Sequence, residues 1–142
     1  MIRFMRWFYA GWLGLTSAAI MLQLYLAGYG VFGFDGLNSF GAHLFLGFLI
    51  GVAVLVGIAL AFAARVPWRI TGLNGVLSAL MVIQAALAHT RVQGISALHV
   101  VNGVLIFALT LYLTREAWNV AKRERAPVPG QEAVPASGAL RA

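Results

Sequence analysis

Four long apolar runs alternate with short polar segments along the chain. They cover about residues 8–29, 42–64, 70–88 and 95–114, and none of them contains a charged residue. Each run is about 20 residues long, and a helix of that length spans the roughly 30 Å hydrocarbon core of a bilayer. Because only helices and closed barrels satisfy the backbone inside lipid, the pattern predicts four transmembrane helices.

The connections between these runs are short, which makes sequential helices antiparallel neighbours. We therefore expect an all-α integral membrane protein, in which residues 1–125 form an up-down-up-down four-helix bundle. Three prolines follow the last apolar run, at Pro127, Pro129 and Pro135. Proline cannot continue a helix, so residues 126–142 are expected to form a disordered tail.

Composition supports the membrane interpretation and removes several kinds of chemistry. The chain is 61% hydrophobic and only 10% charged, whereas a soluble domain averages about 25% charged residues. A water-soluble globule is excluded on this ground, and a disordered chain is excluded by the high hydrophobicity. Because the chain has no cysteine, disulfides, thiolate metal sites, iron–sulfur clusters and c-type haem attachment are excluded too.

The basic residues predict the orientation of the helices. The formal net charge is +6, and every Lys and Arg except Arg91 lies at the termini or in the connection between the second and third runs. By the positive-inside rule, both termini and this connection are cytoplasmic, and the other two connections face outward. The net positive charge is thus explained by topology, and no nucleic-acid partner is expected.

The two halves of the chain resemble each other. The first and third runs share the pattern Gln-x-x-Leu-Ala, starting at Gln23 and Gln84, and the second and fourth share His-x-x-x-Gly, starting at His43 and His99. All four elements lie near the outward ends of their runs. Two tandem helical hairpins of equal orientation imply a pseudo-two-fold axis along the membrane normal. That axis would place His43 opposite His99.

Paired histidines on facing helices suggest ligation of a haem iron. Imidazole is a common axial ligand of haem, and ionisable residues inside membrane spans usually mark function. We expect His43 and His99 to bind the iron of one haem b near the outer face, and Gly47 and Gly103 to leave room for the ring edge. Two further outward residues are candidates for the haem propionates: Arg91 and His89.

Other interpretations of these residues stay open. The histidines are also compatible with interfacial or structural roles, the glycines with helix packing, and Gln23 and Gln84 with hydrogen bonds between helices. The three histidines together also admit a copper or zinc site. The sequence has none of the phosphate-loop, nucleophile-elbow or zinc-protease motifs, so we do not expect an enzyme on its own. Because the spans hold no charge, a transporter or channel is disfavoured.

Two resemblances follow from these residues. The runs Leu22–Gly28, Gly41–Gly47 and Ala97–Gly103 resemble a family of small, uncharacterised bacterial four-helix membrane proteins. The positions of His43 and His99 are also remotely similar to one half of haem A synthase, in which paired histidines on the second and fourth helices of a bundle hold haem. The chain departs from that enzyme by being a single bundle, without a cysteine pair or an outer glutamate.

The sequence therefore predicts a b-type cytochrome-like protein of the bacterial cytoplasmic membrane, for electron transfer or haem handling within a larger redox complex. Its expected partners are the lipid bilayer and either another membrane protein subunit or a quinone. The alternative is a cofactor-free accessory or scaffolding subunit, which packs glycine-rich faces (the chain has 16 Gly) against another membrane protein.

Overall fold

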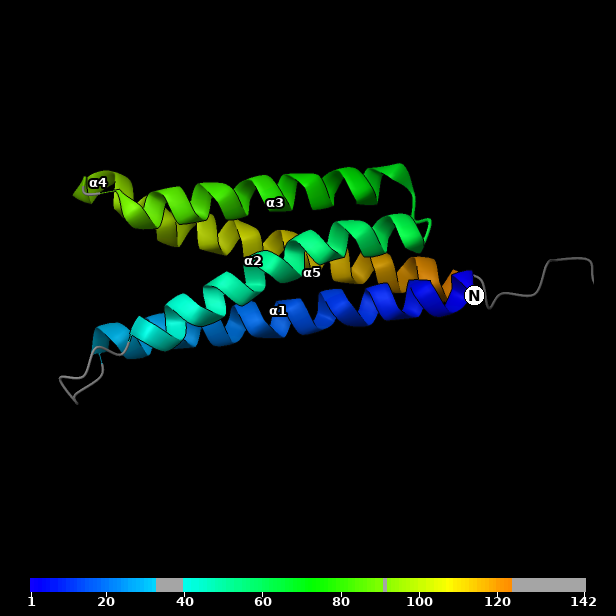
Figure 1. Ribbon diagram of the computed structural model, residues 1–142, viewed down its shortest axis with the longest axis horizontal. Helices are drawn as coiled ribbons and strands as arrows, with labels where there is room; N and C mark the ends of the chain where they lie inside the picture. Colours follow the sequence, from blue (N-terminus) through cyan, green and yellow to red (C-terminus); the bar gives the residue numbers. More distant parts are fainter. Residues whose placement is uncertain (33–39, 91, 124–142) are drawn as a thin grey trace, which may run out of the picture.

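The computed structural model describes residues 1–32, 40–90 and 92–123. This part of the chain is helical and contains no strand, which confirms the all-α fold. Five helices follow one another (Figure 1): α1 (Ile2–Phe32), α2 (Phe40–Ala63), α3 (Trp68–His89), the single turn α4 (Gln93–Ser96) and α5 (Leu98–Arg123). Four helical segments are long and apolar enough to cross a membrane, the last being α4 and α5 taken together.

The helices extend beyond the apolar runs at the ends that carry basic residues. Helix α1 begins at Ile2, about six residues before its apolar run, and α5 continues to Arg123, past the apolar limit at about residue 114. Hydropathy marks only the part of a helix that suits lipid, whereas backbone hydrogen bonding continues into the polar interface. The expected tail, residues 126–142, lies outside the described residues.

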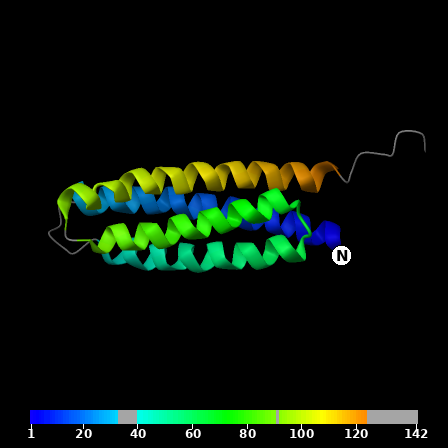
Figure 2. The ribbon, with the colours of Figure 1, turned by 90° about the horizontal axis from the view of Figure 1, so that it is seen from above.

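The four long helices form an antiparallel bundle in which each packs against two others. Helix α1 contacts α2 and α5, and α3 contacts the same two helices, so that α1 and α3 lie on one diagonal and α2 and α5 on the other. The start of α1, the α2–α3 connection and the end of α5 lie at one end of the bundle, with α4 at the opposite end (Figures 1 and 2). This arrangement confirms the up-down-up-down order.

The bundle is apolar outside and partly polar inside. Large apolar side chains such as Phe48, Leu55 and Val82 are exposed, whereas the buried residues include these polar ones: Thr16, Ser17, Thr71, Asn74, Asn102 and Thr110. In water such an exterior would be unfavourable, but in lipid it is the solvated surface. The distribution of side chains therefore agrees with a multi-pass membrane protein.

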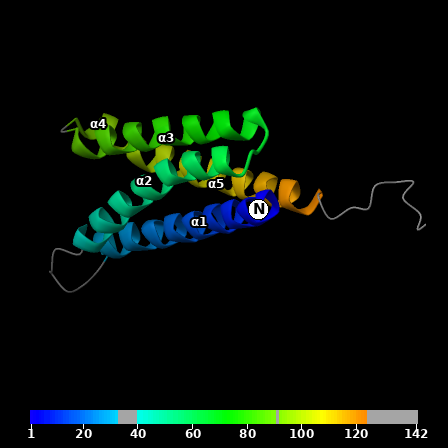
Figure 3. The same ribbon diagram turned by 45° about the vertical axis from the view of Figure 1, so that its right-hand side comes forward.

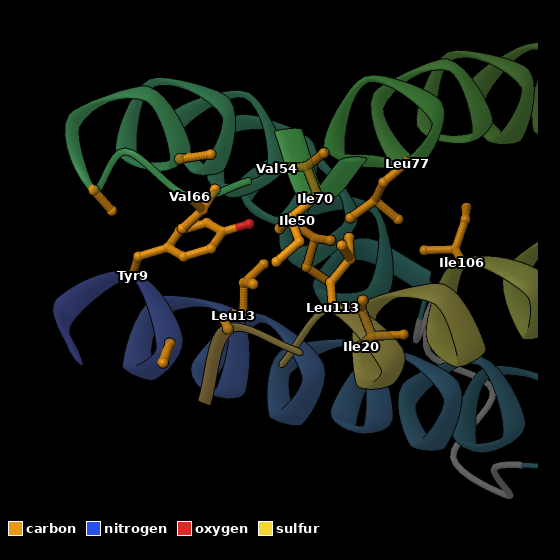
Figure 4. Close-up of a cluster of buried hydrophobic side chains, with 14 residues drawn as sticks. Tyr9, Leu13, Ile20, Ile50, Val54, Val66, Ile70, Leu77, Ile106 and Leu113 are labelled. Carbon is orange, nitrogen blue, oxygen red and sulfur yellow. The ribbon is translucent and has the colours of Figure 1, made fainter. Parts of the chain in front are cut away.

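The close-packed core occupies only one part of the bundle. Its side chains converge from all four long helices (Figure 4), and they include Tyr9, Leu13, Val54, Ile70, Leu77 and Leu113. Among the described residues of 21–32, 40–49 and 78–101, none is fully buried. Toward that end the α1–α2 hairpin diverges from α3 and α5 (Figures 1 and 3). The core thus packs the four long helices tightly at the end with the basic residues, and the other end is less tightly packed.

The internal repeat is visible in the burial pattern. The register that aligns Gln23 with Gln84 also aligns these buried positions of α1 and α3: Tyr9, Ala10, Leu13 and Thr16 with Ile70, Thr71, Asn74 and Leu77. The register that aligns His43 with His99 aligns buried positions of α2 and α5 as well: Ile50, Val54, Gly57 and Ala61 with Ile106, Thr110, Leu113 and Ala117. The two hairpins therefore turn equivalent faces toward one axis.

The core predicts a difference between two leucines of α5. Leu113 is 0% exposed and Leu111 is 46% exposed, so Leu113→Ala leaves a cavity whereas Leu111→Ala only shortens a lipid-facing side chain. We expect Leu113→Ala to lower the free energy of unfolding by about 2 kcal/mol, at the low end for buried leucines because lipid offers no hydrophobic driving force. Leu111→Ala should change it by less than about 0.5 kcal/mol. Equal losses in denaturant titrations in detergent would contradict this core.

Candidate histidine site

His43 and His99 face each other near the divergent end of the bundle. His43 lies in the first turn of α2 and His99 in the first turn of α5, and these two helices lie on a diagonal. The centroids of the two imidazole rings are 6.4 Å apart, and the ring planes are inclined at 61°. Both residues are half-buried. The structure therefore brings together the two side chains that the sequence repeat predicts to be opposite each other.

Each imidazole is held in the same way by the preceding long helix. Nδ1 of His43 lies 3.2 Å from the backbone oxygen of Gln23 in α1, and Nδ1 of His99 lies 3.1 Å from the backbone oxygen of Gln84 in α3. A carbonyl oxygen only accepts a hydrogen bond, so Nδ1 carries the proton in both rings. In the neutral imidazole, Nε2 then keeps its lone pair. This is the tautomer that a metal-binding histidine uses when it coordinates through Nε2.

The glutamine side chains occupy the space over the two glycines. A Cβ added to Gly47 would lie 2.9 Å from Nε2 of Gln23, and one added to Gly103 would lie 3.3 Å from Nε2 of Gln84. Gln23 Nε2 donates a 2.8 Å hydrogen bond to the backbone oxygen of His43. The interhelical role weighed for the glutamines is thus confirmed. Contact of Gly47 and Gly103 with a cofactor stays a prediction.

Asn102 adds a contact that the sequence analysis missed. Its Nδ2 donates to Oε1 of Gln84 at 2.7 Å and to the backbone oxygen of Leu80 at 2.9 Å, and Nε2 of Gln84 lies 3.2 Å from Nε2 of His99. In the first hairpin the position equivalent to Asn102 is Leu46. The signal was a polar residue one turn after His99 in an apolar run, but its target on α3 depends on how the two helices pack.

The other predicted site residues do not join the histidine pair in the described structure. His89 is exposed at the end of α3, and its Nδ1 lies 2.7 Å from the backbone oxygen of Ala85 in its own helix. The described His and acidic residues form no group of three that would hold a metal ion. A copper or zinc site made by all three histidines is therefore wrong. Arg91 lies outside the described residues, so its role and that of His89 toward a propionate stay predictions.

The match to a known family covers most of this site. Residues 23–91 match DUF6220, a family of unknown function. The matching part includes Gln23, His43, Gly47 and Gln84, but it ends before His99 and Asn102. No curated protein and no solved structure matches the chain. The expected similarity to an uncharacterised family is thus found for the DUF6220 segment, and a similarity to haem A synthase is not shown.

The contact between Gly47 and Gln23 predicts a coupling between two substitutions. Gly47→Ala should force the Gln23 amide aside and break its hydrogen bond to His43, whereas Gly41→Ala, on the same helix, meets nothing within 4 Å. We expect Gly47→Ala to be about 1 kcal/mol less favourable for stability than Gly41→Ala.

In a Gln23→Ala background, that difference between the two alanine variants should disappear, because the clashing amide is gone. Unfolding in detergent measures all of these variants. A difference that persists without the Gln23 side chain would show that Gly47 is required for another reason.

Proposed function

We propose that His43 and His99 are the two axial ligands of a haem b. With a metal–nitrogen bond of about 2.0–2.1 Å, and each nitrogen about 1 Å from its ring centre, two imidazoles on opposite sides of one metal have centroids about 6 Å apart. The observed 6.4 Å between the ring centroids is close to that spacing. This separation, between rings held on diagonal helices, is the observation that carries the proposal.

Two further features support the same proposal. The contacts of both Nδ1 atoms with backbone carbonyls leave each Nε2 in its unprotonated form, which is the form that binds a metal. The rings also lie toward the end of the bundle where the two hairpins diverge (Figures 1 and 3), one helical turn from the buried Asn102. Haem would supply a one-electron redox centre there, and the chain would supply its ligands and its apolar surroundings.

The position of the pair limits what such a protein does alone. The close-packed half of the bundle holds polar residues such as Tyr9 and Asn74, but its described part contains no second pair of histidines. One haem near one end does not carry electrons across the whole membrane. We therefore propose a role in electron transfer or haem handling with a partner, either a quinone or another redox subunit, rather than catalysis by this chain alone.

The haem assignment predicts the absorbance of the purified protein. Full-length protein expressed with ample haem should give sharp α and β bands and an intense Soret band on reduction by dithionite. His43→Ala and His99→Ala should each abolish this low-spin spectrum, because each removes one axial ligand. His89→Ala is the matched control: that ring is exposed and bonds the backbone of its own helix, so the low-spin bands should persist.

The alternative is a cofactor-free accessory subunit, and one observation favours it. Nε2 of His99 already lies within hydrogen-bond distance of Gln84, so that ring is satisfied without a metal. A flat difference spectrum from pure, monodisperse protein, together with a stoichiometric membrane partner in native purification, would reject the haem assignment in favour of this role.

We also propose that the end with the basic residues is cytoplasmic. Described residues there include Arg3, Arg6, Arg65, Arg69, Lys122 and Arg123. The side chain of Arg6 donates to the backbone oxygens of Ala64 and Arg65 at the end of α2, where a cation also complements the helix dipole. Excess Lys and Arg on one side support a cytoplasmic location of both termini.

Single cysteines test this orientation cleanly, because the chain has none of its own. Val92→Cys, at an exposed position beside α4, should react with a membrane-impermeant maleimide in intact spheroplasts. Arg123→Cys, at the exposed end of α5, should react only after permeabilisation. The reverse labelling pattern would place the histidine pair on the cytoplasmic side.

A further inference from the structure

The two hairpins differ most in what surrounds Nε2 of each histidine. In the second hairpin, the amide nitrogen of Gln84 lies 3.2 Å from Nε2 of His99. In the first, the amide nitrogen of Gln23 donates instead to the backbone oxygen of His43. No hydrogen-bond partner for Nε2 of His43 is found in the part of the chain that the structure describes. The two rings are therefore related by the repeat but are not chemically equivalent.

Asn102 fixes this difference by orienting the Gln84 side chain. Because Asn102 donates to Oε1 of Gln84, the amide group must turn its nitrogen the other way, toward Nε2 of His99. The second bond of Asn102, to the backbone of Leu80, anchors it on α3. In the first hairpin, with Leu46 at the equivalent position, Oε1 of Gln23 is buried and has no partner among the described residues.

An amide N–H that donates to Nε2 of His99 uses the lone pair that would bind iron. Since Nδ1 of His99 is the protonated nitrogen, Nε2 is an acceptor, and Gln84 competes with a metal for it. His43 faces no such competitor among the described residues. Ligation by His99 therefore requires the loss of one hydrogen bond, whereas ligation by His43 does not.

We propose that His99 is the exchangeable ligand of the pair, because the Asn102–Gln84 contact competes for its Nε2. This inference rests on the proposed haem site. His43 would hold the haem, and the Gln84 amide, oriented by Asn102, would offer Nε2 of His99 a hydrogen bond in place of the iron. Carbon monoxide, a small uncharged ligand of reduced haem, serves as the probe of such an exchangeable ligand.

Carbon monoxide titration of dithionite-reduced, full-length protein tests this proposal. Wild type should show a saturable shift of the Soret band. Gln84→Leu should weaken carbon monoxide binding about fivefold, because removal of one hydrogen bond, worth about 1 kcal/mol, makes His99 a better competitor for the iron. Gln23→Leu is the matched comparison: it also removes an amide that lies over a glycine, but this amide bonds the backbone of His43 and not an imidazole nitrogen, so the affinity should fall less than in Gln84→Leu.

A second variant keeps the test independent of any misfolding of Gln84→Leu. Asn102→Leu introduces the residue of the first hairpin and releases the Gln84 amide without removing it, so carbon monoxide binding should weaken in the same direction. The alanine variants add a qualitative readout. His99→Ala should retain a haem that binds carbon monoxide through His43, whereas His43→Ala should lose most of its haem.

The outcomes separate this inference from the haem proposal itself. A wild-type protein without a Soret band would reject the proposed function, and this inference with it. A Soret band that carbon monoxide does not shift would overturn only the inference, as would equal affinities in wild type, Gln84→Leu and Asn102→Leu. An equal weakening in Gln23→Leu and Gln84→Leu would overturn it too, by showing that the effect is not specific to His99.

Discussion

A polar group inside the hydrocarbon layer must find its partner within the protein, because lipid offers none. Hydroxyl groups of the core meet this constraint locally: Thr16, Ser17 and Thr110 each donate to the backbone oxygen four residues earlier in the same helix. The amide nitrogens of the glutamines find their partners across helices, whereas Oε1 of Gln23 has none among the described residues. Gln23 bonds α1 to α2, and Gln84 connects α3 to α5. Each hairpin is thereby fixed in register by a polar side chain beside a histidine.

This constraint also explains why the site lies where the bundle diverges. At the end with the basic residues, buried side chains from all four long helices fill the axis, and Tyr9 accepts a hydrogen bond from Asn74 across the core. At the other end, hydrogen bonds within each hairpin replace a shared apolar core. Because those bonds stabilise each hairpin separately, the two hairpins can diverge while both histidines stay on the axis.

The sequence predicted the helices and the histidine pair but not the local contacts. Continuous apolar runs set the four spans, and the repeated Gln and His patterns were enough to place His43 opposite His99. The contact of the Gln23 side chain with Gly47 was not predictable, since a glycine indicates that space is needed but not which side chain fills it. Asn102 was missed for a related reason: its partner Gln84 lies on another helix, and helix rotation decides whether they meet.

The repeat places two histidines opposite each other, but it does not give them the same surroundings. Two identical imidazoles, each with an unopposed Nε2, would hold a metal equally from both sides and leave no position for a further ligand. The difference between Leu46 and Asn102 breaks that equality, because Asn102 orients the Gln84 amide toward an imidazole nitrogen, whereas the Gln23 amide donates to a backbone oxygen. The two halves of this duplicated bundle therefore differ chemically at the histidine pair, and the residue that makes the difference lies one helical turn from His99.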